Sequence, residues 1–243
     1  MGAVDSASGP VAIVSAMHEE LHALLDLIEP IDRIEIAGRQ FHRGTLHGRA
    51  VVLALSGIGK VAAAATATLL VDRFAAGELL FTGVAGGLHA DVAVGDVVVA
   101  RSLLQHDMDA SPLFPRYEVP LTGRSRFDAD PGRAAALAQA ARRCLAAPHR
   151  VHEGLIVSGD RFVSSCSESS ALRGALPDAL AVEMEGAAVA QVCSDFGRPF
   201  AVLRSISDRA DDAAHVDFTQ FVAEVASVYT RSIVADWLNR RSS

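Results

Sequence analysis

The sequence has few cysteines, few aromatic residues and no long apolar run. Three cysteines occur in 243 residues, and they form no C-x-x-C pair and no even-numbered framework, which favours a reducing compartment. No apolar stretch reaches the length of a membrane helix, and the first residues lack the basic start and apolar body of a signal peptide. We therefore predict a cytoplasmic protein that has no membrane partner.

A cluster of positive charge is also lacking. The formal net charge at pH 7 is −7, and no run of Lys and Arg stands out, so a nucleic-acid partner is not expected. The length suits one large α/β domain with a substantial core, and a small molecule is the expected ligand. We predict a flexible N-terminal tail at residues 1–9 and a single domain over residues 10–240.

Short apolar segments alternate with segments of helical periodicity along the chain. Strands are predicted at 11–15, within 34–48 as a hairpin, and at 51–55, 79–82, 97–100, 154–158, 180–183 and 200–206. Helices are predicted at 19–28, 61–74, 134–146, 186–193 and 217–238, with Pro30 ending the first element and an irregular loop near 106–130. This order favours an α/β fold with a mixed, largely parallel central sheet flanked by helices.

Two glycine-rich segments follow predicted strands. Residues 56–60, Ser-Gly-Ile-Gly-Lys, connect a strand to a helix but match neither the phosphate-binding loop nor the dinucleotide fingerprint. Residues 83–87, Gly-Val-Ala-Gly-Gly, are predicted as a turn at which the backbone approaches a ligand closely. Both segments are expected to form walls of a site, and no cofactor is predicted.

Single acids stand at or just past the ends of buried strands, at Glu20, Glu185 and Asp208. The carboxyl ends of strands in open α/β sheets meet at one crevice, so the three acids are candidates for one site. A protonated carboxyl beside an ionised carboxylate suits cleavage of a glycosidic bond. The alternative is that the acids are solvated, since Glu19 and Glu20 also suit the first turn of a helix.

A further acidic motif, His106-Asp107-Met108-Asp109, has side chains that bind metals. No second cluster with ligand spacing accompanies it, so no metal is predicted. The absence of a G-x-S-x-G elbow disfavours acyl transfer.

Several motifs together resemble the bacterial 5′-methylthioadenosine/S-adenosylhomocysteine nucleosidases of the purine nucleoside phosphorylase superfamily. They are Ala16-Met-His-Glu-Glu20, Ser56-Gly-Ile-Gly-Lys-Val-Ala62, Val157-Ser-Gly-Asp-Arg-Phe162, Val182-Glu-Met-Glu-Gly186 and Arg204-Ser-Ile-Ser-Asp208. The resemblance covers residues 10–238, and the order and spacing of the motifs make it specific. It implies hydrolysis of an N-ribosidic bond, with release of adenine and a thioribose.

The resemblance also implies roles for four catalytic residues. Glu20 is expected to activate the attacking water, and Arg204 to help hold that water. Glu185 is expected to bind the ribose hydroxyls and to favour the cationic sugar of the transition state. Asp208, protonated because burial raises its pKa, is expected to donate a proton to N7 of adenine.

The implied substrate contacts surround these acids. Met184 is expected to pack on ribose and base, Phe162 to stack on the purine, and the Val163 backbone to meet the edge of the base. The remaining implied contacts are Ser207, which orients Asp208, the apolar walls Ile58 and Phe218, and the lining residues Val84, Ala85, Gly86 and Glu183. Taken alone, the apolar members of this set favour plain core packing.

This chain departs from the family pattern at two places. Val84 stands where the family usually has a serine or threonine near the attacking water and the ribose, which affects the expected rate or substrate range. The proline-rich stretch from Ser111 to Pro120 replaces a segment that often contributes to the neighbour's pocket in the family homodimer. Phe114 and Tyr117 are therefore candidates for reaching across a dimer interface.

Three alternatives remain open at this point. A phosphorylase of the same superfamily would use phosphate in place of water, but Phe81 lies where such enzymes place an arginine for phosphate, and an anion without a nearby cation is poorly stabilised. A hydrolase for another nucleoside, such as futalosine, is the second alternative. A non-catalytic nucleoside-binding protein on the same fold is the third.

Overall fold

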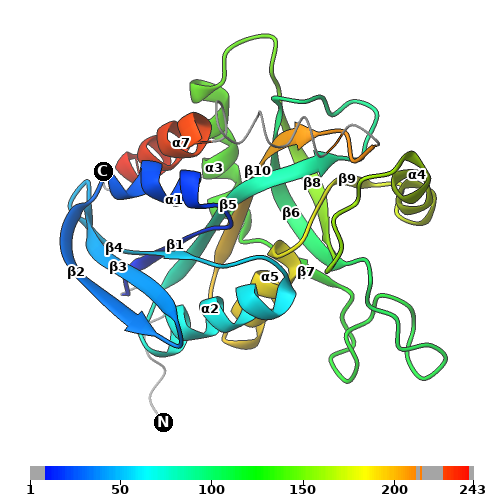
Figure 1. Ribbon diagram of the computed structural model, residues 1–243, viewed down its shortest axis with the longest axis horizontal. Helices are drawn as coiled ribbons and strands as arrows, with labels where there is room; N and C mark the ends of the chain where they lie inside the picture. The colour runs from blue at the N-terminus through cyan, green and yellow to red at the C-terminus, as the bar shows by residue number, and fades with distance from the viewer. Residues whose placement is uncertain (1–8, 212–213, 215–226, 241–243) are drawn as a thin grey trace.

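The computed structural model describes residues 9–211, 214 and 227–240, and its centre is one mixed sheet of ten strands (Figure 1). The strands are β1 (Val11–Ser15), β2 (Glu29–Ile36), β3 (Arg39–Leu46), β4 (Arg49–Leu55), β5 (Glu78–Gly87), β6 (Val97–Gln105), β7 (Arg126–Asp128), β8 (Val151–Ser158), β9 (Ala179–Glu183) and β10 (Phe200–Asp208). The helices are α1 (His18–Leu25), α2 (Lys60–Asp72), α3 (Pro131–Cys144), α4 (Cys166–Ala175), α5 (Gly186–Asp195) and α7 (Ser227–Asn239). The predicted α/β fold with a mixed sheet is confirmed.

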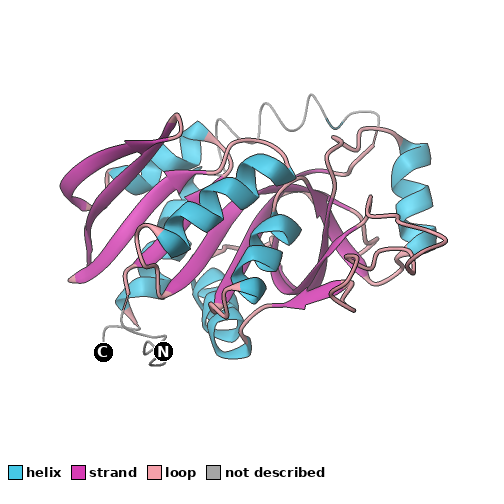
Figure 2. Ribbon diagram, turned by 90° about the horizontal axis from the view of Figure 1, so that it is seen from below, coloured by secondary structure: helices cyan, strands magenta, loops and turns pink. Residues whose placement is uncertain are grey.

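Helices cover both faces of the sheet. Helices α1, α3 and α7 pack together on one face, and α2 packs beside α5 on the other (Figures 1 and 2). The strands between these layers are buried on both sides, which explains why β1 and β10 are buried along their whole length. Among the described helices, none combines the length and apolar character that crossing a membrane requires.

Strand β5 connects the two halves of the sheet. It pairs in parallel with β1 and with β10, and its last residues, Gly86 and Gly87, pair antiparallel with β9. Because β10, β6, β8 and β9 also pair in succession, these strands and β5 form a closed ring. The carboxyl ends of β5, β9 and β10 are thereby brought to one place.

The predicted turn at residues 83–87 is wrong, because these residues continue strand β5. The small residues serve close packing inside the sheet instead. A Cβ atom on Gly86 would lie 2.8 Å from Asp208 Oδ1 and 2.9 Å from the Cβ of Ala210, so a larger residue would displace the end of β10.

Other differences concern the ends of elements. Helix α1 ends at Leu25 rather than near residue 28, and Pro30 lies inside β2, an edge strand where its missing N–H is tolerated. Strand β6 extends to Gln105, beyond the predicted end at residue 100. Helix α4 and the short strand β7 were not predicted, and β7 falls inside the expected loop. Residues 217–226 of the predicted last helix lie outside the described part of the chain.

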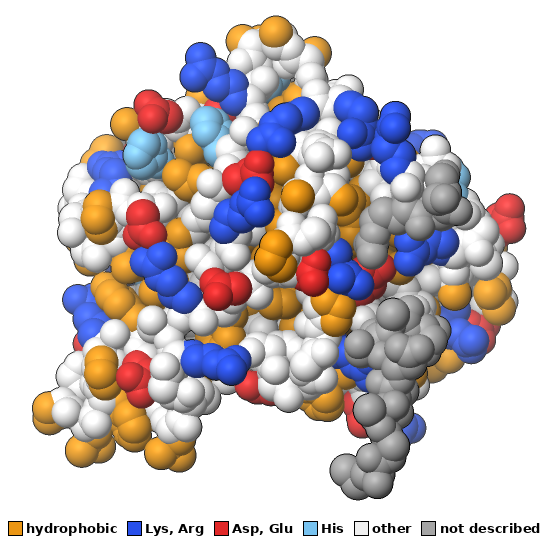
Figure 3. All heavy atoms as spheres, turned by 180° about the vertical axis from the view of Figure 1, so that it is seen from behind, with side chains coloured by type: hydrophobic (Ala, Val, Ile, Leu, Met, Phe, Trp, Pro, Cys, Tyr) orange, Lys and Arg blue, Asp and Glu red, His pale blue; other side chains and the backbone are white. Residues whose placement is uncertain are grey.

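The loop between β6 and β7 projects from the body of the molecule at the lower right of Figure 1. It exposes large apolar side chains, with Leu113 at 83% and Leu121 at 91% of full exposure. On the face shown in Figure 3, Lys and Arg are interspersed with Asp and Glu. This view shows no large patch of one charge sign.

Candidate active site

A cavity of about 470 Å³ opens at the carboxyl ends of the central strands. Eleven of the residues predicted for the site line it: Ile58, Val84, Ala85, Gly86, Phe162, Val163, Glu183, Met184, Glu185, Ser207 and Asp208. Four further lining residues, Ala16, Met17, Arg161 and Val182, were not predicted. Glu20 and Arg204 are not among the lining residues, and Phe218 lies outside the described residues.

Asp208 is the last residue of β10 and reaches the cavity beside Ser207. The register between β10 and β5 shifts between Ile206 and Asp208, an irregularity of the kind that re-aims side chains near active sites. Asp208 Oδ1 accepts a hydrogen bond from the Ala210 backbone N–H at 2.8 Å. The Ser207 hydroxyl lies 2.8 Å from Asp208 Oδ2 and 3.4 Å from the Ala85 carbonyl oxygen. The carboxyl is thus fixed in a buried polar setting.

Glu185 lies between β9 and α5, at the first position before the helix. Its Oε1 accepts a hydrogen bond from the Gly59 backbone N–H at 2.8 Å. Burial and the neighbouring Glu183 carboxylate raise the pKa of Glu185 above its ordinary value, whereas the Gly59 N–H and Arg204 lower it. The environment therefore brings the ionisation of this carboxyl toward neutral pH.

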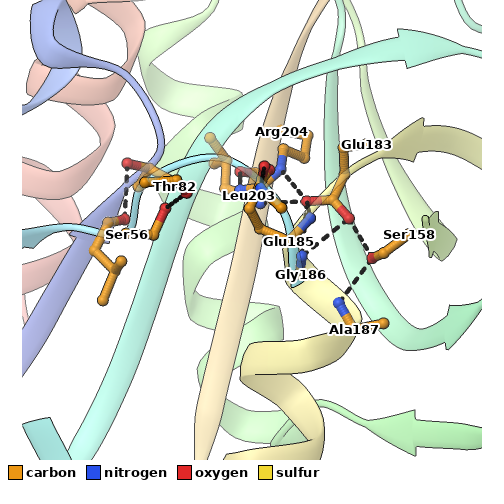
Figure 4. A network of polar contacts seen from close by, with 12 residues as sticks. Ser56, Thr82, Ser158, Glu183, Glu185, Gly186, Ala187, Leu203 and Arg204 are labelled. Atoms are coloured by element: carbon orange, nitrogen blue, oxygen red, sulfur yellow. Dashed lines mark hydrogen bonds and ion pairs between the residues drawn. The ribbon is translucent and has the colours of Figure 1, made fainter. Parts of the chain in front are cut away.

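Glu183 and Arg204 form a buried ion pair behind the cavity (Figure 4). Arg204 Nη2 lies 2.6 Å and Nε 3.2 Å from Glu183 Oε2, and Nη1 donates to the Leu203 carbonyl at 3.1 Å. The guanidinium carbon stacks 4.0 Å from the centroid of the Phe81 ring. Phe81, which argues against a phosphate site in the sequence, is thus a packing surface for Arg204.

The other contacts of Glu183 hold the start of α5. Its carboxylate accepts from the Gly186 N–H at 2.8 and 3.0 Å and from the Ser158 hydroxyl, and Ser158 Oγ accepts from the Ala187 N–H at 2.7 Å (Figure 4). Acids at a helix N-terminus are favoured by the exposed N–H groups and the helix dipole. Although Glu183 lines the cavity, its observed contacts orient the segment that carries Glu185.

Removing the cation of this pair is expected to destabilise the fold. Arg204→Met leaves the Glu183 carboxylate buried without its charged partner, and the expected loss is about 3 kcal/mol of unfolding free energy. Urea denaturation of the two proteins measures the difference. Arg143→Met is the matched control, because its ion pair with Asp236 is partly exposed and breaking it should cost less than about 1 kcal/mol. Equal losses in both variants would contradict this account of the buried pair.

Glu20 is fully buried in the first turn of α1. Thr230 Oγ1 of helix α7 donates to Glu20 Oε1 at 3.1 Å, while Oε2 has no hydrogen-bond partner among the described residues. Burial raises the pKa of Glu20 from 4.5 to about 7, against the lowering effects of Arg204, Thr230 and the Met17 backbone. The alternative that this acid is solvated is wrong, whereas Glu19 is exposed. Because the Met17 backbone acts directly on the Glu20 carboxyl and Met17 lines the cavity, Glu20 adjoins the cavity wall.

The apolar walls differ in burial. Ile58 is 67% and Phe162 41% exposed, so both lie at the mouth of the cavity, whereas Val163 is buried and Met184 is half-buried. Plain core packing therefore does not account for Ile58 and Phe162. Large apolar groups open to solvent beside a cavity suit contact with a ligand.

The loop residues Phe114 and Tyr117 are half-buried in this chain. Tyr117 packs against a buried apolar cluster that includes Leu104 and Val163, and the Arg116 guanidinium stacks on its ring. A contribution of this loop to a neighbouring subunit stays a prediction.

The structure also adds supporting residues that the sequence predictions had not assigned. Thr230 comes from a helix remote in sequence, and no local pattern marks it as a partner of Glu20. Ser158 and Gly59 lie inside motifs that the family resemblance used, so their positions were indicated although their contacts were not. His106, Asp107 and Asp109 belong to no cluster of three metal-ligating side chains among the described residues.

The chain is similar to known proteins over most of its length. Residues 10–238 match the model of the Phosphorylase superfamily. The chain is 37% identical over 226 residues to a 5′-methylthioadenosine/S-adenosylhomocysteine nucleosidase of Bacillus thuringiensis (strain Al Hakam), covering 92% of this chain and 96% of the relative.

Solved structures show the same similarity. The 5′-methylthioadenosine/S-adenosylhomocysteine nucleosidase from Neisseria meningitidis, in complex with methylthio-immucillin-A, superimposes with a TM-score of 0.90 at 36% identity. The match covers 96% of this chain and 99% of the other. Futalosine hydrolase of Helicobacter pylori strain 26695 superimposes with a TM-score of 0.88 at 34% identity, covering 96% and 98%.

Proposed function

Because this chain belongs to the phosphorylase superfamily, we propose that it is a nucleosidase that hydrolyses the N-ribosidic bond of 5′-methylthioadenosine, S-adenosylhomocysteine or both. The observation that carries the proposal is the convergence of buried acids on one cavity. Glu185 and Asp208 line it, and Glu20 lies against its wall with one carboxylate oxygen that has no hydrogen-bond partner in the described part of the chain. The similar proteins from Bacillus thuringiensis and Neisseria meningitidis, both 5′-methylthioadenosine/S-adenosylhomocysteine nucleosidases, support the choice of substrate.

Asp208 is the general acid in this proposal. The Ser207 hydroxyl has one hydrogen and two oxygen neighbours, Asp208 Oδ2 and the Ala85 carbonyl. The hydroxyl donates to Asp208 Oδ2 and the Ala210 N–H donates to Oδ1, so the carboxyl is held in one orientation and its acidic proton is not committed to Ser207. A proton transferred from the carboxyl to N7 allows adenine to leave as a neutral base, which lowers the barrier to breaking the bond.

Glu20 and Glu185 act on the sugar side. As the bond to adenine breaks, positive charge develops at C1 and the ring oxygen of the ribose, and the Glu185 carboxylate stabilises that charge while binding the ribose hydroxyls. Glu20 accepts a proton from water through its unpartnered Oε2, and the water adds to C1. Arg204, held by Glu183, stabilises the ionised forms of Glu20 and Glu185.

The cations near the cavity are already paired with carboxylates, which favours water over phosphate as the nucleophile. Arg204 is bound to Glu183, and Lys60 is bound to Asp107. Arg161 is the one cation among the described lining residues, and it pairs with Glu168. Within the described residues, a phosphate ion in the cavity would therefore find no cation that is not already paired with a carboxylate, which supports hydrolysis. The buried acids argue against a purely binding protein, which has no need of groups that transfer protons.

Futalosine is the second candidate substrate, because futalosine hydrolase is among the similar structures. Its 5′ substituent carries a carboxylate, whereas that of methylthioadenosine is a neutral thioether. The wall residues Ile58 and Phe162 at the cavity mouth are apolar and suit contact with a neutral thioether better than contact with a charged substituent. The homocysteine group of S-adenosylhomocysteine is also charged, so this comparison favours methylthioadenosine among the three nucleosides. The neutral thioether is therefore the preferred substrate in this proposal.

A substrate panel tests the proposal. Methylthioadenosine, S-adenosylhomocysteine and futalosine are incubated with the purified protein, and the released base is quantified by chromatography. Adenine release with the highest kcat/KM for a thioether nucleoside is expected. Release from futalosine alone would move the assignment to the second candidate, and release from none of them would contradict a nucleosidase of this class.

The rate is expected to fall as the pH drops below about 7. Glu20 must be ionised to accept a proton from water, and the pKa of its carboxyl is about 7, so the inactive protonated form accumulates below that pH. The raised pKa of Glu185 adds a second ionisation with the same sign. A profile of kcat/KM against pH measures the acid limb. A rate that stays constant down to pH 5 would exclude Glu20 as the base.

We also propose that the protein acts as a homodimer, with the 106–127 loop near the neighbour's pocket. Supporting this, large apolar side chains are exposed on the loop and at the cavity mouth, including Leu113, Leu121 and Ile58. Light scattering gives the mass in solution.

A further inference from the structure

Three segments, namely the start of α2, the turn after β6 and the loop after β8, are joined by one polar cluster, formed by Lys60, Asp107 and Asp160. Lys60 Nζ donates to Asp107 Oδ1 at 2.6 Å and to Gln105 Oε1 at 3.0 Å. Asp107 Oδ2 accepts from the Asp160 backbone N–H at 2.9 Å. Asp160 Oδ1 in turn accepts from the Lys60 backbone N–H at 2.7 Å, which closes the ring of contacts.

The cluster lies one residue from a contact in the site. The residue before Lys60 is Gly59, whose N–H donates to Glu185 Oε1. Gly59 has φ 91°, a region that favours glycine, and a Cβ atom there would lie 3.0 Å from Asp160 Oδ1. Adjacent backbone N–H groups thus bind Asp160 and Glu185, and the orientation of one constrains the other.

Helix α2 supplies no side-chain cap of its own. The N-cap position, before the first helical residue Lys60, is Gly59, and Asp160 from the loop after β8 takes the place of a capping side chain. Asp107 follows β6 and belongs to the motif that the sequence offered as a possible metal ligand. The Asp107 carboxylate instead accepts hydrogen bonds from the Lys60 ammonium group and the Asp160 backbone N–H, and both contacts lower the pKa of Asp107.

We propose that Lys60, Asp107 and Asp160 are positioning residues that hold the Gly59 N–H on the Glu185 carboxylate and so fix that carboxylate for the reaction. The inference rests on the proposed function for the role of Glu185, but the contact it explains is independent of that function. The cluster also ties this contact to the loop that carries Phe162 and Val163, the predicted contacts of the base.

Loss of the cluster has a predictable electrostatic effect. The charged groups acting on Glu185 are Glu183, which raises its pKa, and Arg204, which lowers it. The backbone groups of Gly59 and Met184 also lower it. If the Gly59 N–H turns away, the pKa of Glu185 rises further, so the ionised form persists only at higher pH. The acid limb of the rate profile then moves upward.

Hydrogen exchange of the Gly59 amide is the first test, because it needs no activity. Asp107→Asn and Lys60→Met are compared with Asp109→Asn, a matched control in the same motif whose carboxylate contacts Ser111 and Arg116. We expect at least ten-fold faster exchange at Gly59 in the first two variants and no change in the control. Unchanged exchange in both cluster variants would overturn the inference. If Lys60→Met fails to fold, the near-isosteric Asp107→Asn decides.

Kinetics supply the second readout. In the cluster variants we expect kcat/KM on methylthioadenosine to fall about ten-fold, with the acid limb shifted upward by about half a pH unit or more. The double variant should be no worse than the poorer single one, since the residues act as a unit. Accelerated exchange with unaltered kinetics in an active enzyme would overturn the positioning role. A wild-type protein inactive on every nucleoside would refute the proposed function but leave the exchange result standing.

Discussion

Asp208→Asn is expected to lower kcat by roughly 10²–10⁴-fold, with a much smaller effect on KM. Asparagine keeps the shape of the side chain and can accept from the Ala210 N–H, so the cavity is preserved. It has no acidic proton to transfer to N7, and adenine would have to leave without protonation. Steady-state kinetics on methylthioadenosine measure the loss.

Ser207→Ala is the comparison for this variant. It removes the neighbour of Asp208 Oδ2 without removing the acid, so the expected decrease is smaller, about ten-fold. An Asp208→Asn enzyme with near wild-type kcat would exclude Asp208 as the general acid.

Glu20→Gln is expected to reduce kcat by a similar factor, roughly 10²–10⁴-fold, because the amide cannot take a proton from water. The Thr230 hydroxyl can still donate to the remaining carbonyl oxygen, so the side chain should keep its place. Thr230→Val is the companion variant. It removes the hydrogen bond that orients Glu20 and leaves the carboxylate, so a smaller decrease is expected.

Glu20→Gln is also expected to stabilise the protein at pH 8. The folded-state pKa of Glu20 is raised from 4.5 to about 7, so the folded protein binds a proton more tightly than the unfolded chain. This contribution to stability is present in full below pH 4.5 and is lost as the pH rises through 7. At pH 8 the buried charge therefore lowers stability, and a neutral glutamine relieves that cost.

The expected gain is roughly 1–3 kcal/mol, since 2.5 pKa units correspond to about 3 kcal/mol and a buried amide group recovers only part of it. Urea denaturation of wild type and Glu20→Gln at pH 5 and pH 8 measures it. A difference between the proteins that does not depend on pH would contradict a raised pKa at Glu20.

The sequence predicted which residues lie around the cavity better than it predicted the contacts among them. Buried strands ending at acids placed Glu185 and Asp208 at one edge of the sheet, because parallel strands present their carboxyl ends together. Residues 84–86 line the cavity, as the sequence predicted for the small residues 83–87, but the assignment of these residues to a turn was wrong. A strand rich in glycine and a turn rich in glycine look alike in sequence, and only the close approach of β10 to these residues of β5 distinguishes them.

Contacts between distant segments could not be predicted. Thr230 meets Glu20 only because α7 packs against α1, and no spacing within either helix encodes that pairing. Asp107 lies in a motif whose side chains can bind metals, although no metal was predicted, and only the fold brings Lys60 to it. Val84, which stands in place of the family hydroxyl, lines the cavity.

The most direct test of hydrolysis is the fate of the oxygen that reaches C1 of the ribose. Methylthioadenosine is turned over in water enriched in oxygen-18, with phosphate present, and the sugar product is analysed by mass spectrometry after a short reaction time. Unlabelled methylthioribose added to a parallel sample corrects for exchange with solvent. We predict methylthioribose that carries one labelled oxygen at C1. Methylthioribose-1-phosphate without that label would contradict the account, because phosphate rather than water would then be the nucleophile.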